Sequence, residues 1–206
     1  MRILVIDDTQ ANLDAALQTL NGHSVTLCST HNEAIELLHR KNDEEALHKL
    51  KKQLMEEGIG WEEAYFKAKK ETLLPYWDAV LCDLLMPPTN KNQNHPELFI
   101  NEMPVGWSLA LQAAKEGAKL VAVVTATNHH HHPASTMLDT ISEHIFIVDG
   151  AKMLLTNYER KVELAGTEHA CKECNGSEEC CQCDGTGVII EEGKDWGSVL
   201  DILIKG

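Results

Sequence analysis

Basic and aromatic residues are both scarce in this chain of 206 residues. Lysine and arginine number 18 against 32 aspartates and glutamates, which gives a formal net charge of −14 at pH 7. Because phosphate backbones and anionic lipid headgroups repel such a chain, neither nucleic acid nor a membrane surface is expected as a partner. Phenylalanine, tryptophan and tyrosine make up 5% of the residues, too few to predict a surface that stacks on bases.

Long apolar runs are missing as well. None approaches the ~20 residues of a membrane span, and the first ends at Asp7 and Asp8, before it reaches the length of a signal peptide. We therefore expect a cytoplasmic protein. In a reducing compartment the seven cysteines predict metal ligands or free thiols rather than disulfides. Cys28 and Cys82 stand alone among apolar residues, which predicts buried core side chains.

Apolar runs alternate with stretches of helical spacing along the chain. Apolar residues three and four apart predict helices near 13–20, 106–116 and 135–141. The continuous runs are typical of strands covered on both faces, and they fall at 2–6, 24–28, 79–81, 120–124 and 145–148. This order predicts an α/β fold with a doubly wound, five-stranded parallel sheet. In such sheets the functional crevice lies beyond the carboxyl ends of the strands.

Two stretches interrupt this alternation. Residues 40–73 carry lysine and glutamate at three- and four-residue spacing, and Gly58 and Gly60 divide them, which predicts a helical hairpin inserted at about 43–77. Residues 88–105 are rich in proline and asparagine and predict a long inserted loop.

Acidic residues follow the predicted strands. Asp7 and Asp8 end the first strand, and Asp83 ends the third. Carboxylates that converge on one sheet edge repel each other unless a cation neutralises them. Oxygen ligands of this kind suit magnesium. Alternatively, these acids only terminate strands as turn formers.

With these pieces the chain resembles the receiver domain of two-component response regulators over about residues 1–150. The first strand with its acidic pair, an Asp-x-x-Met-Pro pattern, a glycine-led helix and a Thr-Ala step occur in the order of that family. They lie at Ile3–Asp8, Leu81–Pro87, Gly106–Ala110 and Val123–Ala126.

The resemblance implies a flavodoxin-like fold and phosphorelay signalling with a histidine kinase. It implies that Asp83 is the phosphoacceptor and that the Thr125 hydroxyl binds a phosphoryl oxygen. Phe146 would occupy the aromatic switch position. The implied magnesium ligands are Asp7, Asp8, Asp83 and the Leu85 carbonyl. Catalysis would rest on alignment and charge neutralisation.

One departure concerns the cation of the family. Receivers carry an aromatic-x-x-Lys-Pro step at their last strand, and that lysine pairs with the phosphoryl group. Here Asp149 stands at the corresponding place after Phe146. Lys152 is then the nearest candidate cation, and whether Asp83 is phosphorylated stays open.

Histidines gather after the Thr-Ala step. His129–His132 follow Thr125, and His95 lies in the inserted loop. Two readings remain open: a solvated polar loop, or one or two imidazoles that contact a transition metal or a phosphate.

Five cysteines cluster between Cys171 and Cys183. Two Cys-x-x-Cys pairs, each followed by a glycine two residues on, predict one tetrahedral zinc held by four thiolates. The expected ligands are Cys171, Cys174, Cys180 and Cys183, with Cys181 to spare. The second pair resembles the zinc repeats of DnaJ-type chaperones. A rubredoxin-like iron or a redox dithiol are the alternatives.

The chain after the cysteines ends in an amphipathic segment. Trp196 to Ile204 has the spacing of a helix, and its apolar side needs a surface to bury it. The fifth helix of the receiver is either this segment or Met153–Leu164. We expect a receiver-like domain at 1–165, a zinc module at 166–190 and a C-terminal helix at 191–206, so that the zinc module is an insertion.

Three functions fit this sequence. The first is an atypical receiver that binds magnesium, with Asp83 as the candidate phosphoacceptor, and signals by protein contact. The second is a pseudo-receiver scaffold with a structural zinc site. The third is a metal-dependent phosphatase-like hydrolase that uses the same carboxylates with histidine as acid or base. Oligomeric state and the identity of the partner are not predicted.

Overall fold

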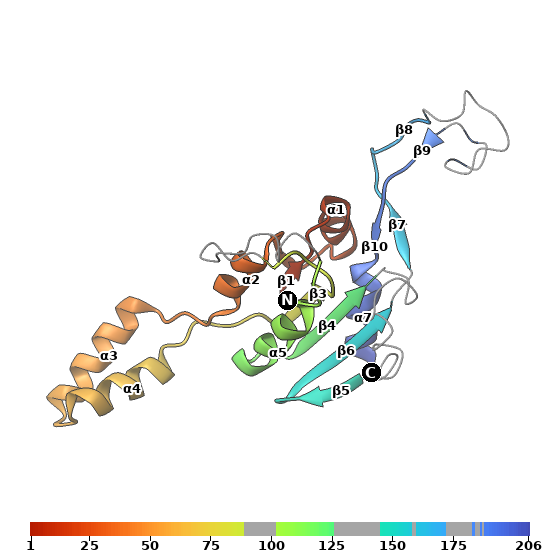
Figure 1. Ribbon diagram of the computed structural model, residues 1–206. Coiled ribbons are helices and arrows are strands. Elements are labelled where there is room, and N and C mark those ends of the chain that lie inside the picture. The colour runs from red at the N-terminus through yellow and green to blue at the C-terminus, as the bar shows by residue number, and fades with distance from the viewer. Residues whose placement is uncertain (89–101, 126–144, 158–159, 172–182, 184–185, 187) are drawn as a thin grey trace, which may run out of the picture.

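The computed structural model describes residues 1–88, 102–125, 145–157, 160–171, 183, 186 and 188–206. These residues contain six helices around a central, mostly parallel six-stranded sheet (Figure 1). The expected helix at 135–141, His95 and His129–His132 lie outside them, as does most of the loop at 88–105. No helix in the described part of the chain is long and apolar enough to cross a membrane.

The sheet has the strand order β2-β1-β3-β4-β6-β5. Its strands are β1 (Arg2–Ile6), β2 (Ser24–Cys28), β3 (Ala79–Asp83), β4 (Leu120–Thr125), β5 (Ile145–Val148) and β6 (Ala151–Asn157). The first five in this order pair in parallel, and β5 pairs antiparallel with β6 at the edge. The fold is therefore α/β, as the alternation in the sequence predicts.

Helices cover both faces of the sheet, and the alternation of side chains along each strand divides the core between them. Leu4 and Ile6 of β1 pack in one cluster, with residues of α2 (His31–Leu38) and α5 (Gly106–Glu116). Ile3 and Val5 pack in the other, with residues of α1 (Gln10–Thr19) and α7 (Trp196–Lys205). Side chains buried on both faces explain why these strands are continuously apolar. Cys28 and Cys82 are buried in the first cluster, as predicted.

The predicted five-stranded sheet is wrong at its far edge. The run at 145–148 is an antiparallel edge strand, β5, and Phe146 pairs with Met153. Asp149 and Gly150 form the tight turn after it, with φ of 49° and 80°, the backbone that an Asp-Gly hairpin turn requires. The fifth parallel strand is β6, in a segment for which the sequence also suggested a helix. Its apolar residues are consecutive because a central strand buries both faces.

The C-terminal helix completes the second face. Trp196 is fully buried, and its indole Nε1 donates to the Asn12 carbonyl oxygen at 2.9 Å. Val199, Leu200 and Leu203 pack with it beside α1 and against β4 and β6. The amphipathic segment thus finds the surface that its apolar side requires, and it takes the place of the fifth helix.

Between β6 and α7 the chain leaves the sheet and returns as an antiparallel ribbon. Its inner pair is β7 (Lys161–Glu163) with β10 (Glu192–Lys194), and its outer pair is β8 (His169–Ala170) with β9 (Val188–Ile189). Figure 1 shows the outer pair reaching well away from the sheet. The cysteine-rich segment between β8 and β9 is therefore inserted between β6, which belongs to the sheet, and α7, which packs against the sheet.

The stretch inserted after α2 forms the two predicted helices. They are α3 (Glu44–Glu56) and α4 (Trp61–Glu71), which pack through a small core around Leu54, Ala64 and Ala68. Figure 1 shows both projecting away from the sheet. At the base, the Asp43 backbone N–H donates to the Thr72 carbonyl oxygen at 2.9 Å.

Deleting residues 43–72 and joining the ends with a short linker should leave a protein that unfolds cooperatively. The ends already lie together, because Leu74 donates its backbone N–H to the Lys41 carbonyl oxygen at 2.9 Å, and the small hairpin core is separate from both sheet cores. Urea unfolding followed by circular dichroism tests this. Truncation before Trp196, the matched control, should abolish cooperative unfolding because it removes α7, which covers one face of the sheet. Loss of cooperativity in the hairpin deletion would show that the hairpin belongs to the main folding unit.

Candidate functional site

Three carboxylates meet at one edge of the sheet. Asp7 and Asp8 directly follow β1, and Asp83 is the last residue of β3. One oxygen of each lies within 4.8 Å of the others. Asp7 is fully buried and Asp83 is 8% exposed, whereas Asp8 reaches solvent. The structure thus brings together the three predicted magnesium-binding carboxylates.

A buried lysine lies between two of these acids. The Lys194 Nζ donates to Asp7 Oδ2 at 2.6 Å and to Asp83 Oδ1 at 2.5 Å. The lysine is 4% exposed, and its ammonium also lies 5.3 Å from the centre of the Trp196 ring. Hydrogen bonds between ionised partners in a site shielded from water are among the strongest in proteins.

Asp7 is held from two further sides. The Asn12 Nδ2 donates to both of its oxygens, at 3.0 and 3.1 Å, and the Thr9 backbone N–H donates to Oδ1 at 2.9 Å. The Asn12 Oδ1 in turn accepts the Lys194 backbone N–H at 3.0 Å. Asn12 therefore links the first acid and the lysine, and it fixes both from the start of α1.

The ribbon places Lys194 by packing against α1. Gly193 allows this approach: a Cβ there would lie 2.4 Å from the Ala11 carbonyl oxygen and 2.5 Å from the Ala15 Cβ. The Gln18 side chain donates to the Glu163 carbonyl oxygen at 2.9 Å and accepts from the Ala165 backbone N–H at 3.2 Å. Trp196 then anchors the chain on the other side of the lysine. The lysine thus enters the site between two fixed points.

Burial and like charges shift the ionisation of these groups. Burial raises the pKa of Asp83 above its ordinary value; Lys194 opposes this shift and Asp7 reinforces it. Burial and the charge of Asp7 raise the pKa of Asp8, and Glu102 adds a smaller effect. Burial alone would lower the pKa of Lys194, but Asp83 and Asp7 outweigh it, so the pKa is raised and the ammonium stays protonated.

This balance leaves the site short of positive charge. When all are ionised, three carboxylates face one ammonium, which leaves two formal negative charges. The donor set consists of carboxylate oxygens, the ligands that magnesium prefers. These residues therefore fit a hard divalent cation beside Lys194. Among the described residues, the ion pairs of Lys194 are with Asp7 and Asp83, which leaves Asp8 as the third carboxylate for the cation.

Three further residues of the receiver pattern, Thr125, Leu85 and Gly106, lie close to this edge, whereas Phe146 is on the edge strand β5, where it pairs with Met153. Thr125 is the last residue of β4 and is 1% exposed; its neighbour Val124 is paired with Asp83. Leu85 follows Asp83 by two residues, with its side chain buried in the first core cluster. Gly106 begins α5 beside the residues that follow β3, and its backbone N–H donates to the Leu84 carbonyl oxygen at 3.1 Å.

Lys152 and Asp149 lie at the opposite end of the parallel strands from the acidic site, so neither can contribute to it. Lys152 pairs with Leu120, the first residue of β4, and its Nζ donates to the Leu203 carbonyl oxygen at 3.5 Å. Asp149 is in the turn that leads into β6. Asp149 therefore does not stand beside the site in the place of the family's lysine, and Lys152 is not the cation of the site.

Lys194 is the residue that sequence reasoning missed. It is separated from Asp7 by 187 positions and from Asp83 by 111, and no family pattern places a lysine there. A usable signal existed nonetheless. Acids that were expected to converge on one sheet edge require a cation, and Lys194 lies two residues before Trp196, next to the segment that had to pack against the sheet.

Only two of the predicted zinc ligands lie among the described residues. Cys171 and Cys183 are 8% and 6% exposed and form a small cluster with Ile189 of β9. The Thr186 hydroxyl donates to the Cys183 carbonyl oxygen. Cys174, Cys180 and the spare Cys181 lie outside the described residues. Cys171 and Cys183, one from each predicted pair, thus lie together at the same end of the ribbon.

Comparison with known protein families, with curated proteins and with solved structures finds no match to this chain. The geometry and charge of the site are therefore what indicate the function.

Proposed function

We propose that this protein is an atypical response-regulator receiver that binds Mg²⁺ at Asp7, Asp8 and Asp83 and accepts a phosphoryl group on Asp83. The observation that carries the proposal is the Lys194 ammonium, bonded to Asp83 at the edge where Asp7, Asp8 and Thr125 also lie. The resemblance calls for a lysine that pairs with the phosphoryl group, and Lys194 supplies one from a different part of the chain.

Two further observations support the proposal. The parallel strands follow the order β2-β1-β3-β4-β6, which is the order of flavodoxin-like sheets, in which ligands bind beyond the strand carboxyl ends. The acids and Thr125 stand at those ends. In the transfer step, an Asp83 oxygen forms a bond to phosphorus while the bond from phosphorus to the donor's leaving atom breaks, and that atom keeps the electron pair. Lys194 would pair with the phosphoryl oxygens, and Mg²⁺ held by Asp7, Asp8 and Asp83 would supply further positive charge.

The output would be a protein contact, in a reducing cytoplasm where the cysteines stay reduced. The hairpin presents Trp61 and Phe66 to solvent, 59% and 60% exposed, and large exposed aromatic side chains on a projecting element are typical of interaction surfaces. A histidine kinase or another signalling protein is the proposed partner.

A phosphodonor experiment tests this proposal. Wild type incubated with acetyl phosphate and MgCl2 should gain the mass of one phosphoryl group, and beryllofluoride should raise its melting temperature. Asp83→Asn should abolish both effects. Asp201→Asn, which removes an exposed carboxylate paired with Lys205 on α7, should leave both unchanged. Absence of a mass gain, of a beryllofluoride shift and of any MgCl2 effect on melting would overturn the proposal. Steady release of phosphate would instead indicate the hydrolase.

A second function is a pseudo-receiver scaffold. The observation that favours it is that Lys194 already bridges Asp7 and Asp83, so the buried acids are partly neutralised without metal or phosphate. In this case partners would bind to the hairpin and to a zinc-bearing ribbon. The ion cluster at the edge of the sheet would only stabilise the fold.

The ribbon should carry about one zinc per chain, because four thiolates complete a tetrahedral site. Cys171→Ser and Cys174→Ser should each release the metal and increase proteolysis between β8 and β9. Cys181→Ser, the matched control, should keep it. Elemental analysis of protein purified without chelator measures the metal, and a metal-free wild type would overturn the zinc site. Equal loss in all three variants would show that Cys181 is also needed.

A further inference from the structure

A cleft with many positive charges lies at the base of the helical hairpin, away from the acidic edge. It consists of two adjoining pockets of about 160 and 590 Å³, and both are lined by Arg40 and Lys41. Arg2 lines the smaller pocket, and Lys51 and Lys69 line the larger one. We call this pair of pockets the basal cleft. It joins the linker after α2, the start of β1 and the inner side of the hairpin.

The charge of the basal cleft is opposite to that of the chain as a whole. Five of the 18 lysines and arginines line it, in a protein of net charge −14. Among the residues that line the two pockets, Glu44 is the single acid. None of the ion pairs recorded for the described residues involves the five cations. Clustered cations without acidic partners repel one another, and a bound anion would relieve that repulsion.

Backbone carbonyls hold the two arginines of the smaller pocket. The Arg2 Nη1 donates to the Pro75 carbonyl oxygen at 2.6 Å, and the Arg40 Nε donates to the Leu74 carbonyl oxygen at 3.3 Å. A guanidinium has five N–H donors, so each arginine keeps donors for a ligand while its position is fixed. Two acids lie near the smaller pocket. An Asp78 carboxylate oxygen accepts the Arg2 backbone N–H, and the charge of Glu116 adds to burial in raising the pKa of Tyr76.

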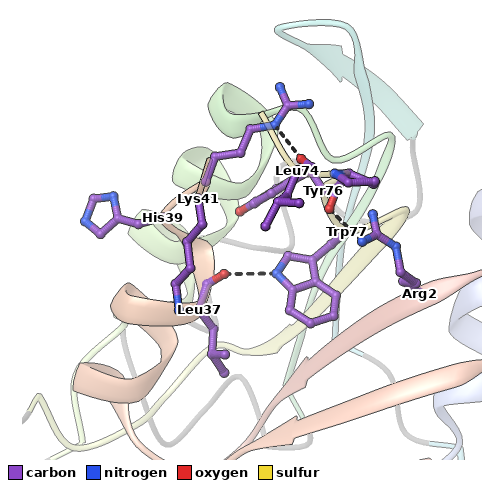
Figure 2. A pocket seen from close by; sticks show the side chains of 9 residues that line it. Arg2, Leu37, His39, Lys41, Leu74, Tyr76 and Trp77 are labelled. Atoms are coloured by element: carbon purple, nitrogen blue, oxygen red, sulfur yellow. Dashed lines mark hydrogen bonds between the residues drawn. The ribbon is translucent and has the colours of Figure 1, made fainter. Parts of the chain in front are cut away.

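The wall of the smaller pocket is built from ordered aromatic residues. The Trp77 Nε1 donates to the Leu37 carbonyl oxygen at 3.0 Å, and the Tyr76 hydroxyl donates to the Leu38 carbonyl oxygen at 2.7 Å. Figure 2 shows Arg2, Lys41 and these two aromatic side chains gathered around the pocket. The smaller pocket is thus a preformed feature of the fold, and it fixes Arg40 at the border with the larger pocket.

We propose that the basal cleft binds a small molecule that carries two or more phosphate groups. Planar guanidinium forks match phosphate oxygens, and lysine ammonium groups add charge. The larger pocket falls within the size range of small-molecule sites. Arg40 and Lys41 lie between the two pockets, so one ligand can place a phosphate on each side of them. A long polyanion would meet the acidic remainder of the chain.

Calorimetric titration with inorganic tripolyphosphate, in magnesium-free buffer at physiological salt, tests this inference. Wild type should bind one equivalent. The double variant Arg40→Gln, Lys41→Gln should weaken binding at least tenfold, and so should Lys51→Gln, Lys69→Gln, which leaves the carbonyl contacts of the arginines intact. The control Lys161→Gln, Lys205→Gln removes the same charge from surface ion pairs elsewhere and should bind as wild type does.

Further arms separate the competing explanations. Asp83→Asn should bind tripolyphosphate normally, so a failure of the receiver function would leave this site intact. Absence of binding by wild type, or equal weakening in the control double variant, would overturn the proposal. Tighter binding of a decaglutamate peptide than of tripolyphosphate would also overturn it, because the cleft would then be a site for an acidic protein segment.

Discussion

Replacing Lys194 with methionine should destabilise the protein by about 3–5 kcal/mol at neutral pH, because removing one partner of a buried ion pair leaves an uncompensated charge. Methionine keeps the length and apolar stem of the side chain but leaves Asp7 and Asp83 facing each other without a cation. Urea denaturation measures the loss. The matched control is Lys161→Met on the same ribbon. Its ion pair with Glu192 is about half exposed, so the cost should stay below about 1 kcal/mol.

The pH and magnesium dependence of Lys194→Met should identify the cause. Without the lysine, burial and the charge of Asp7 raise the pKa of Asp83 further above its ordinary value, because Lys194 no longer opposes them. A raised pKa favours folding at low pH, and that contribution is lost as the pH rises. The deficit relative to wild type should therefore shrink in mildly acidic buffer. Added MgCl2 should also reduce it, by binding to the native state. A deficit independent of both would mean that only packing was lost.

Asp83→Asn should behave differently from the lysine variant. It removes one buried carboxylate but leaves Lys194 paired with Asp7 at 2.6 Å, so no buried charge is left without a partner. We therefore expect a fold that is intact and close to wild-type stability, with strong magnesium binding lost. The contrast between the two variants separates a structural contribution of the ion cluster from its role in binding.

Gly193→Ala should cost about 1–3 kcal/mol and should also loosen Lys194. The added methyl group would meet the Ala11 carbonyl oxygen and the Ala15 Cβ at 2.4 and 2.5 Å, so the ribbon would have to move away from α1. Overpacking of this kind forces backbone shifts. Because Lys194 follows directly, the variant should show part of the magnesium dependence expected for Lys194→Met. Thermal unfolding with and without MgCl2 measures both effects.

Gly60→Ala provides the control for the glycine prediction. Nothing lies within 4 Å of a Cβ at Gly60, and the residue caps α4 far from the acidic edge. We expect a cost below about 1 kcal/mol, the size of a change in a helix cap, with no effect of magnesium. If Gly193→Ala resembled this control, the contact between the ribbon and α1 would not be what positions the lysine.

The errors in the predicted sheet have local physical reasons. The sequence Asp149-Gly150, flanked by apolar residues, is typical of a two-residue hairpin turn, yet the alternation of apolar runs with helical spacing predicts 145–148 as the last strand of a parallel sheet. In the adjacent strand β6, Met153, Leu154 and Leu155 are consecutively apolar because β6 lies inside the sheet and buries side chains on both faces. Periodicity alone does not distinguish such a strand from a buried helix.

The amino-acid sequence alone determined the elements with strong patterns and the acids of the site. Apolar runs that end at Asp7 and Asp83 define strands, and parallel strands bring their carboxyl ends to one edge, so the meeting of these carboxylates was predictable. The amphipathic spacing after Trp196 likewise required a buried helix. These are local patterns combined with a single rule of topology.

Only the tertiary structure decided which cation meets those acids. Lys194 reaches them because the ribbon packs on α1 at Gly193 and because Trp196 is buried beside Asn12. Neither contact leaves a periodic signal in the sequence, since each depends on the shape of a surface more than a hundred residues away along the chain. The two lysines could be told apart only in three dimensions: Lys152, which is nearer in sequence to the receiver pattern, lies at the opposite end of the parallel strands, whereas Lys194 is held in the site.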